Sequence, residues 1–184
     1  EGFDMAGAAR QIEAAEYHLS PMAGRGFTAP NRAQGLRTTW AGGSVTYVPR
    51  AEGDWTMTWT TTGLGRGATL APAGAVVSET TKDGRIVWNR GGFDEWYIND
   101  DRGVEQGFTV RQKPEGEGLL VVEGILAGVT PVLQGPRGDI SLVGPGGAEV
   151  LRLKSLFVFD AFKRTLPSHF EVSGNTVRPK TSAV

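Results

Sequence analysis

The sequence predicts an all-β fold, an antiparallel β-sandwich of about ten to twelve short strands. Its 184 residues include 27 glycines and 10 prolines, about a fifth of the chain, and both residue types interrupt helices and favour turns. Apolar side chains also recur at every second position in short segments bounded by turn residues, which is typical of half-buried strands. The length suits one domain or two very small ones, and no linker clearly splits the chain, so a single domain over residues 1–184 is expected. We find no repeat of 20–50 residues, which argues against a propeller.

The alternation is clearest at residues 55–62, where Trp55, Met57 and Trp59 lie on one face and threonines on the other. A short strand is also expected after Gly174-Asn175. The remaining strands are predicted at residues 44–48, 85–88, 93–98, 105–111, 119–126, 139–143, 149–153, 156–160 and 166–172.

The lead-in, residues 1–32, is expected to be irregular, with one short helix. Residues 5–19 are rich in alanine and favour a short helix, although residues 16–19 alternate enough to form a strand instead. Pro21, Gly24, Gly26 and Pro30 then predict irregular structure up to about Arg32.

Composition removes several functional classes. The net charge of −1 argues against nucleic-acid binding, which needs a basic stripe, and no apolar run approaches the roughly 18 residues of a membrane-spanning helix. The chain has no cysteine for a thiolate metal site, and its two histidines, His18 and His169, are far apart in sequence. We therefore expect no cofactor, with Ca²⁺ left open.

One glycine-rich segment matches a nucleotide-binding pattern. Residues 63–68 read Gly-Leu-Gly-Arg-Gly-Ala and follow a predicted strand. That mechanism requires a helix to open there, but Pro72 and Gly74 follow. A turn between strands is the favoured interpretation.

An acidic cluster carries three alternatives. A solvated turn, whose side chains bond to their own backbone, is favoured. Carboxylates in a loop could also hold Ca²⁺. A glycosidase or lyase would instead need Glu95 and Glu105 about 5–10 Å apart across a concave cleft. The cluster consists of Asp94, Glu95, Asp100, Asp101 and Glu105.

The five tryptophans suggest either a core or a platform on which sugar rings stack, and the alternation around Trp55 and Trp59 favours the core. Trp96 and Tyr97 are adjacent, so they face opposite sides of one strand. One of the two is therefore the best candidate for a surface contact. The candidate ligand-binding residues are Trp96, Tyr97, Asp100, Asp101 and Glu105.

Three segments, residues 29–37, 95–110 and 156–167, resemble an N-terminal β-rich module of large secreted or surface bacterial proteins that carry FG-GAP, VCBS or SBBP propeller-type repeats. The resemblance implies no catalytic residues. It implies that Gly103 and Gly107 serve a turn and a close backbone approach, and that Asp160 and Arg164 form a turn. The final strand of the family pattern is not evident in this sequence.

We therefore expect a non-enzymatic, extracellular structural, adhesion or assembly module. Its partners would be other protein chains or its own copies, joined through sheet edges, with no nucleic acid and no membrane insertion. The first alternative is a carbohydrate-binding module, assisted by Ca²⁺ or not, with glycans as partners. The second is the glycosidase or lyase built on the acidic cluster.

Overall fold

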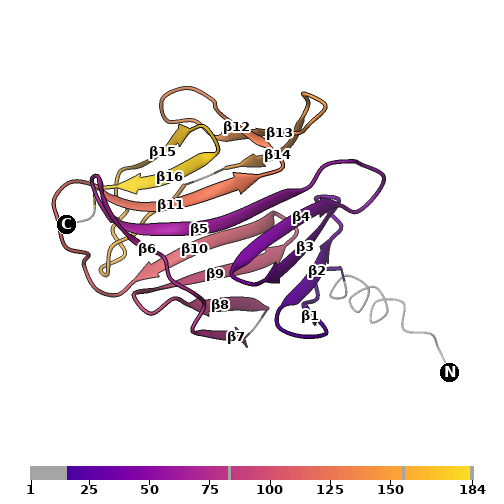
Figure 1. Ribbon diagram of the computed structural model, residues 1–184, viewed down its shortest axis with the longest axis horizontal. Coiled ribbons are helices and arrows are strands. Elements are labelled where there is room, and N and C mark those ends of the chain that lie inside the picture. Colours follow the sequence, from indigo (N-terminus) through magenta and orange to yellow (C-terminus); the bar gives the residue numbers. More distant parts are fainter. Residues whose placement is uncertain (1–15, 83, 155, 183–184) are drawn as a thin grey trace.

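The computed structural model describes residues 16–82, 84–154 and 156–182. It confirms the all-β prediction: these residues form sixteen strands in antiparallel sheets, consistent with a β-sandwich (Figure 1). None of the described residues lies in a helix, so none of them belongs to a helix that could cross a membrane.

The largest sheet runs in the order β1-β2-β3-β4-β5-β11-β16-β15, and β6 also pairs with β5. Its strands in the first part of the chain are β1 (Ser20–Pro21), β2 (Phe27–Asn31), β3 (Leu36–Ala41), β4 (Ser44–Pro49), β5 (Met57–Arg66) and β6 (Thr69–Pro72). The later strands are β11 (Leu120–Ala127), β15 (Ser168–Ser173) and β16 (Thr176–Thr181). A two-residue turn with Gly174 at φ +56° joins β15 to β16.

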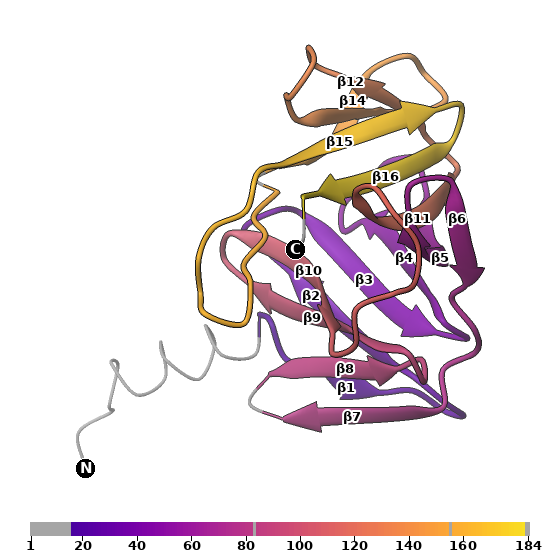
Figure 2. The same cartoon turned by 90° about the vertical axis from the view of Figure 1, so that its left-hand side faces the viewer.

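Two smaller sheets pack on the large one. The four-stranded sheet has the order β10-β9-β8-β7, and Figure 2 shows it in front of β2, β3 and β4. Its strands are β7 (Ser78–Lys82), β8 (Arg85–Asn89), β9 (Phe93–Asp100) and β10 (Gly103–Val110). The three-stranded sheet consists of β12 (Thr130–Leu133), β13 (Ile140–Val143) and β14 (Glu149–Leu153).

One hydrophobic core joins the three sheets. Trp40 of β3 and Trp88 of β8 both pack edge-on against Tyr97 of β9, with ring centroids 6.1 and 5.5 Å from it. Leu142 of the three-stranded sheet belongs to the same cluster. As predicted from the alternation, Trp59 is buried, and Trp55 packs partly buried against this core.

The structure corrects the prediction for the lead-in. Residues 27–31 form β2 in spite of Pro30, because β1 pairs only with Phe27 and Thr28. From Ala29 onward no strand of the described residues lies beside the outer side of β2, so the missing N–H of Pro30 costs no ladder bond there. The predicted helix at 5–19 falls mostly outside the described residues, and residues 16–19 form a turn followed by irregular backbone.

The second correction concerns residues 156–160, which form no strand. One isolated bridge, between Phe159 and Thr165, replaces the predicted pairing. The carboxylate of Asp160 accepts the backbone N–H groups of Phe162 and Arg164 and closes a tight turn there. The glycine-rich segment at 63–68 instead continues β5 into a hairpin with β6, so no helix follows it.

Candidate functional site

A buried polar cluster surrounds Glu95 on the inner face of β9. Arg90 Nε donates to its Oε2 atom at 2.6 Å. Its Oε1 atom accepts from Thr61 Oγ1 and Gln106 Nε2, both at 2.8 Å, and from the hydroxyl of Tyr97. Since both Glu95 and Arg90 are buried, these four donors satisfy a carboxylate that water does not reach.

The other nitrogens of Arg90 are also occupied. Nη2 donates to the carbonyl of Gly43 at 2.7 Å, and Nη1 donates to that of Gly74 at 2.9 Å. Burial and the charge of Glu95 raise the pKa of Tyr97 well above its usual value, and the same two causes raise the pKa of Tyr47. The cluster therefore holds the four-stranded sheet against the large sheet, and its charged groups are buried.

The predicted pair of acid groups does not flank a common cleft. Glu105 lies opposite Ile98 and Glu95 lies opposite Phe108, so the two carboxylates face opposite sides of the four-stranded sheet. Glu95 is also fully buried. This arrangement does not supply the acid and base that glycoside hydrolysis would require.

Two of the remaining carboxylates of the cluster, Asp94 and Asp100, have partners. Asp94 accepts from Arg111, and this hydrogen bond lowers the pKa of Asp94. Asp100 accepts from the guanidinium of Arg102, with 2.6 Å between Oδ2 and Nη2, and that bond lowers the pKa of Asp100. In the described part of the chain, no group of three histidine, aspartate or glutamate side chains could hold a metal ion.

The structure separates Trp96 from Tyr97. Tyr97 is 1% exposed and lies in the core, whereas Trp96 is half-buried on the outer face of the sheet. Its ring fills the space beside Gly107 on the neighbouring strand, where an added Cβ would come within 2.0 Å of it. Gly107 thus serves the close approach that the family resemblance implies. The guanidinium of Arg85 lies 3.9 Å from the centroid of the same ring.

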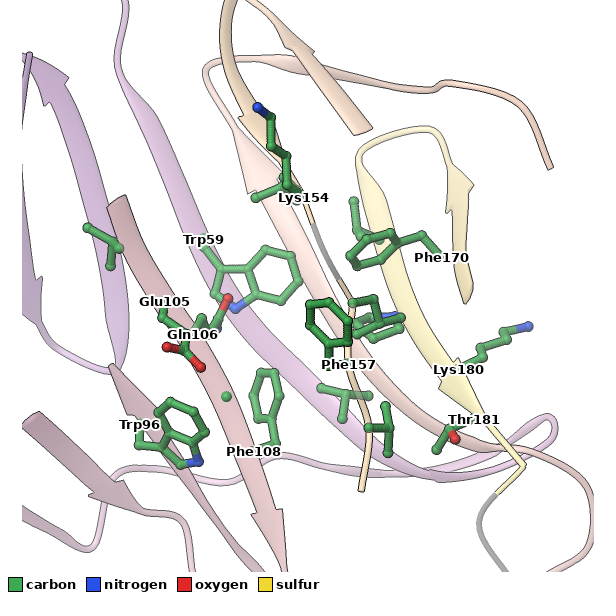
Figure 3. A pocket seen from close by; sticks show the side chains of 18 of the residues that line it. Trp59, Trp96, Glu105, Gln106, Phe108, Lys154, Phe157, Phe170, Lys180 and Thr181 are labelled. Atoms are coloured by element: carbon green, nitrogen blue, oxygen red, sulfur yellow. The ribbon is translucent and has the colours of Figure 1, made fainter. Parts of the chain in front are cut away.

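A cavity of about 660 Å³ lies beside β10 (Figure 3), a size that holds drug-sized ligands in other proteins. Figure 3 shows β10 on one side of it, with Trp59 and Phe108 in the middle and Phe157 and Phe170 opposite. Strands β11 and β16 of the large sheet contribute further apolar lining.

The lining shows how β10 borders this cavity. Neighbouring residues of a strand point to opposite faces, so a cavity that touches one face meets every second residue. Here five consecutive residues, 104–108, all contribute to the lining. Strand β10 pairs with β9 on one side and has no strand described on the other. The cavity is therefore a groove along the free edge of β10, which we call the β10 groove.

The wall opposite β10 carries exposed phenylalanines. Phe157 and Phe159 line the groove with 68% and 59% of their surface exposed. Phe162 is 80% exposed at the turn just beyond and does not line the groove. Asp160 fixes this turn, since its Oδ2 atom accepts Arg164 Nε at 2.6 Å. The turn that the resemblance implies for Asp160 and Arg164 is thus present.

The three segments that carry the family resemblance meet around β10. Asn31 Nδ2 donates to Asn99 Oδ1 at 2.8 Å and to the carbonyl of Asp100 at 2.7 Å. Gln34 Nε2 donates to the carbonyl of Asp101 at 3.0 Å. These bonds tie the first segment to the turn that precedes β10, and the third segment forms the opposite wall of the groove.

Two of the candidate ligand-binding residues, Trp96 and Glu105, line the β10 groove. Asp100 and Asp101 lie at the turn before β10, and Tyr97 lies in the core. Sequence reasoning missed the aromatic wall because the apolar run at 156–159 reads as a strand. The turn at Asp160 was the one sequence signal that the neighbouring phenylalanines would lie outside a strand and remain exposed. The missed residues are Trp59, Phe108, Phe157, Phe159 and Phe170.

Comparisons of this chain with models of protein families, with curated proteins and with solved structures give no match.

Proposed function

We propose that this protein is a non-enzymatic assembly module that binds a segment of another polypeptide chain in the β10 groove. The observation that carries the proposal is the free edge of an eight-residue strand beside an apolar cavity. Its setting, a secreted or surface protein of a bacterium, rests on the family resemblance of residues 29–37, 95–110 and 156–167.

The free edge supports a polypeptide ligand because an unpaired strand presents backbone donors and acceptors to any extended chain beside it. Exposed apolar side chains add to this, since monomeric proteins rarely leave large apolar patches open without a binding role. Phe157 and Phe159 place such surface along the opposite wall.

A glycan has less support at the same place. Sugar rings stack on an open aromatic face, and Arg85 lies over the ring of Trp96. Tyr97 is buried and offers no face to a ligand. Asp100 is engaged by Arg102, which leaves Glu105 as the carboxylate of the candidate set that lines the groove.

The test is a selection of peptides from a displayed random library on the full chain. We expect bound peptides whose affinity falls at least tenfold in the double variant F157E/F159E, because two charges would enter the apolar wall. The matched control is F162E, which changes a phenylalanine of greater exposure outside the groove lining and should leave the affinity unchanged.

Two results would contradict the proposal. The first is a selection that yields no peptide sensitive to F157E/F159E. The second is equal loss of binding in F162E, which would assign the effect to general surface charge. Because all three side chains are largely exposed, neither variant should change the unfolding temperature, and that measurement verifies folding.

A further inference from the structure

We infer that the ligand of the β10 groove is an amphipathic β-strand that adds to the edge of β10. Its apolar side chains would alternate along the strand and enter the cavity, and a cationic side chain on its other face would lie beside Glu105. This inference rests on the proposed function and names the class of segment that the groove accepts.

The register of β10 fixes which side chains face inward. Gln106 lies opposite the buried Tyr97, and Phe108 lies opposite the buried Glu95, so both point toward the large sheet. Glu105 and Gly107 point to the outer face. A strand added to this edge would lie about 4.8 Å from β10 and continue the same two faces.

The inner face of the added strand would meet apolar surface. Phe108, Trp59 and Val177 line that side of the groove, and Phe157 closes it from the opposite wall. A segment with apolar residues at every second position would fill this space without burying polar side chains. A segment with its apolar residues grouped together would place half of them on the outer face.

The outer face of the added strand would meet a carboxylate. Glu105 forms no hydrogen bond or salt bridge within the described part of the chain, although its charge interacts electrostatically with that of Arg102. Opposite charges on neighbouring strands contribute roughly 0.2–1 kcal/mol, and like charges are destabilising. The outer face therefore favours lysine or arginine over glutamate at the position beside Glu105.

The backbone of β10 distinguishes this mode from a small molecule held in the same cavity. An edge strand leaves every second N–H and C=O group pointing away from its neighbour. These groups of β10 face the groove, since β9 occupies the other side. Strand addition would pair them, whereas an apolar small molecule would leave them in contact with water.

The experiment uses three nine-residue peptides and the full chain. The first has valine at every second position, with lysine and threonine between. The second has the same composition with the valines adjacent, and the third replaces the lysines of the first with glutamate. We expect the first to bind at least tenfold more tightly than the second and to slow amide hydrogen exchange in β10. The variant E105K should reverse the preference for the first peptide over the third.

The outcomes separate this inference from the proposed function. Equal binding of the first two peptides, or unchanged exchange in β10, would overturn strand addition while leaving a peptide site in place. An unchanged charge preference in E105K would overturn the role of Glu105. If none of the three designed peptides binds, the library sequences decide: a period-two apolar pattern supports the inference and its absence overturns it. A library without groove-dependent binders overturns the proposed function itself.

Discussion

Arg90 and Glu95 form an ion pair inside the protein, with 2.6 Å between Nε and Oε2 and with both side chains buried. The pair spans the sharp connection between β8 and β9, and Glu95 reaches from there to Thr61 on β5. Two sheets are thus joined by a charged group at a place where apolar packing would be usual. Such a pair is sensitive to the loss of one partner, because the other charge then remains buried without compensation.

The first prediction concerns this pair. The substitution E95Q should lower the free energy of unfolding by about 3–5 kcal/mol, since it leaves the Arg90 charge buried without a counterion. Urea denaturation measures the change. E149Q is the matched control, because it removes the carboxylate of an exposed pair with Arg152, and it should change stability little. If E95Q and E149Q lowered the free energy of unfolding equally, burial of the Arg90–Glu95 pair would not be the cause of the loss.

The second prediction concerns the glycine beneath Trp96. The substitution G107A should destabilise the fold by roughly 1–3 kcal/mol, since the new methyl group overlaps the indole ring. G92A is the control, because an added Cβ there meets no atom within 4 Å. In the W96L background, where the indole ring is absent, G107A should lower the free energy of unfolding by less than it does in the parent chain. A G107A protein as stable as the parent chain would contradict the packing of Trp96 on Gly107.

The third prediction concerns acid stability. The hydrogen bond from Arg111 lowers the pKa of Asp94 in the folded state. The stabilisation is therefore complete above the unfolded-state pKa of about 3.9 and is lost as pH falls through the lower folded-state value. D94N should be less stable than the parent chain at pH 7, and this difference should shrink below about pH 4. D101N, which removes an exposed carboxylate, is the control, and a constant difference for D94N across this range would contradict the prediction.

The fold class could be predicted because alternation is local. Residues 85–88 and 149–153 show it in their own sequence, and they form strands with nearly those bounds. Strand β2 could not be predicted because Pro30 argues against a strand unless it is known which side of β2 is paired, and that depends on how far β1 and β3 extend along it. The strands β7 and β12 carry few buried apolar residues, so their patterns are weak.

The candidate site was predicted only in part for a similar reason. The sequence places Trp96 on the opposite face from Tyr97, and the structure confirms that one of them is less buried: Trp96 is half-buried and Tyr97 is fully buried. It does not reveal that Glu95 and Arg90 neutralise each other, or that residues 156–159 lie across from β10. Arg90 and Glu95 are only five residues apart, but their burial depends on the large sheet that packs over them. The position of residues 156–159 depends on contacts with a distant part of the chain.

The hydrogen bonds of Arg90 and Glu95 have a consequence for how the molecule opens. Arg90 bonds to the carbonyls of Gly43 and Gly74, and Glu95 bonds to Thr61 and Gln106. Any excursion that separates the four-stranded sheet from β4 and β5 must break the bonds to Gly43 and Thr61 together and bring a charge pair into water. Slow hydrogen exchange should therefore disappear from both sheets at one common denaturant concentration, as a single cooperative unit.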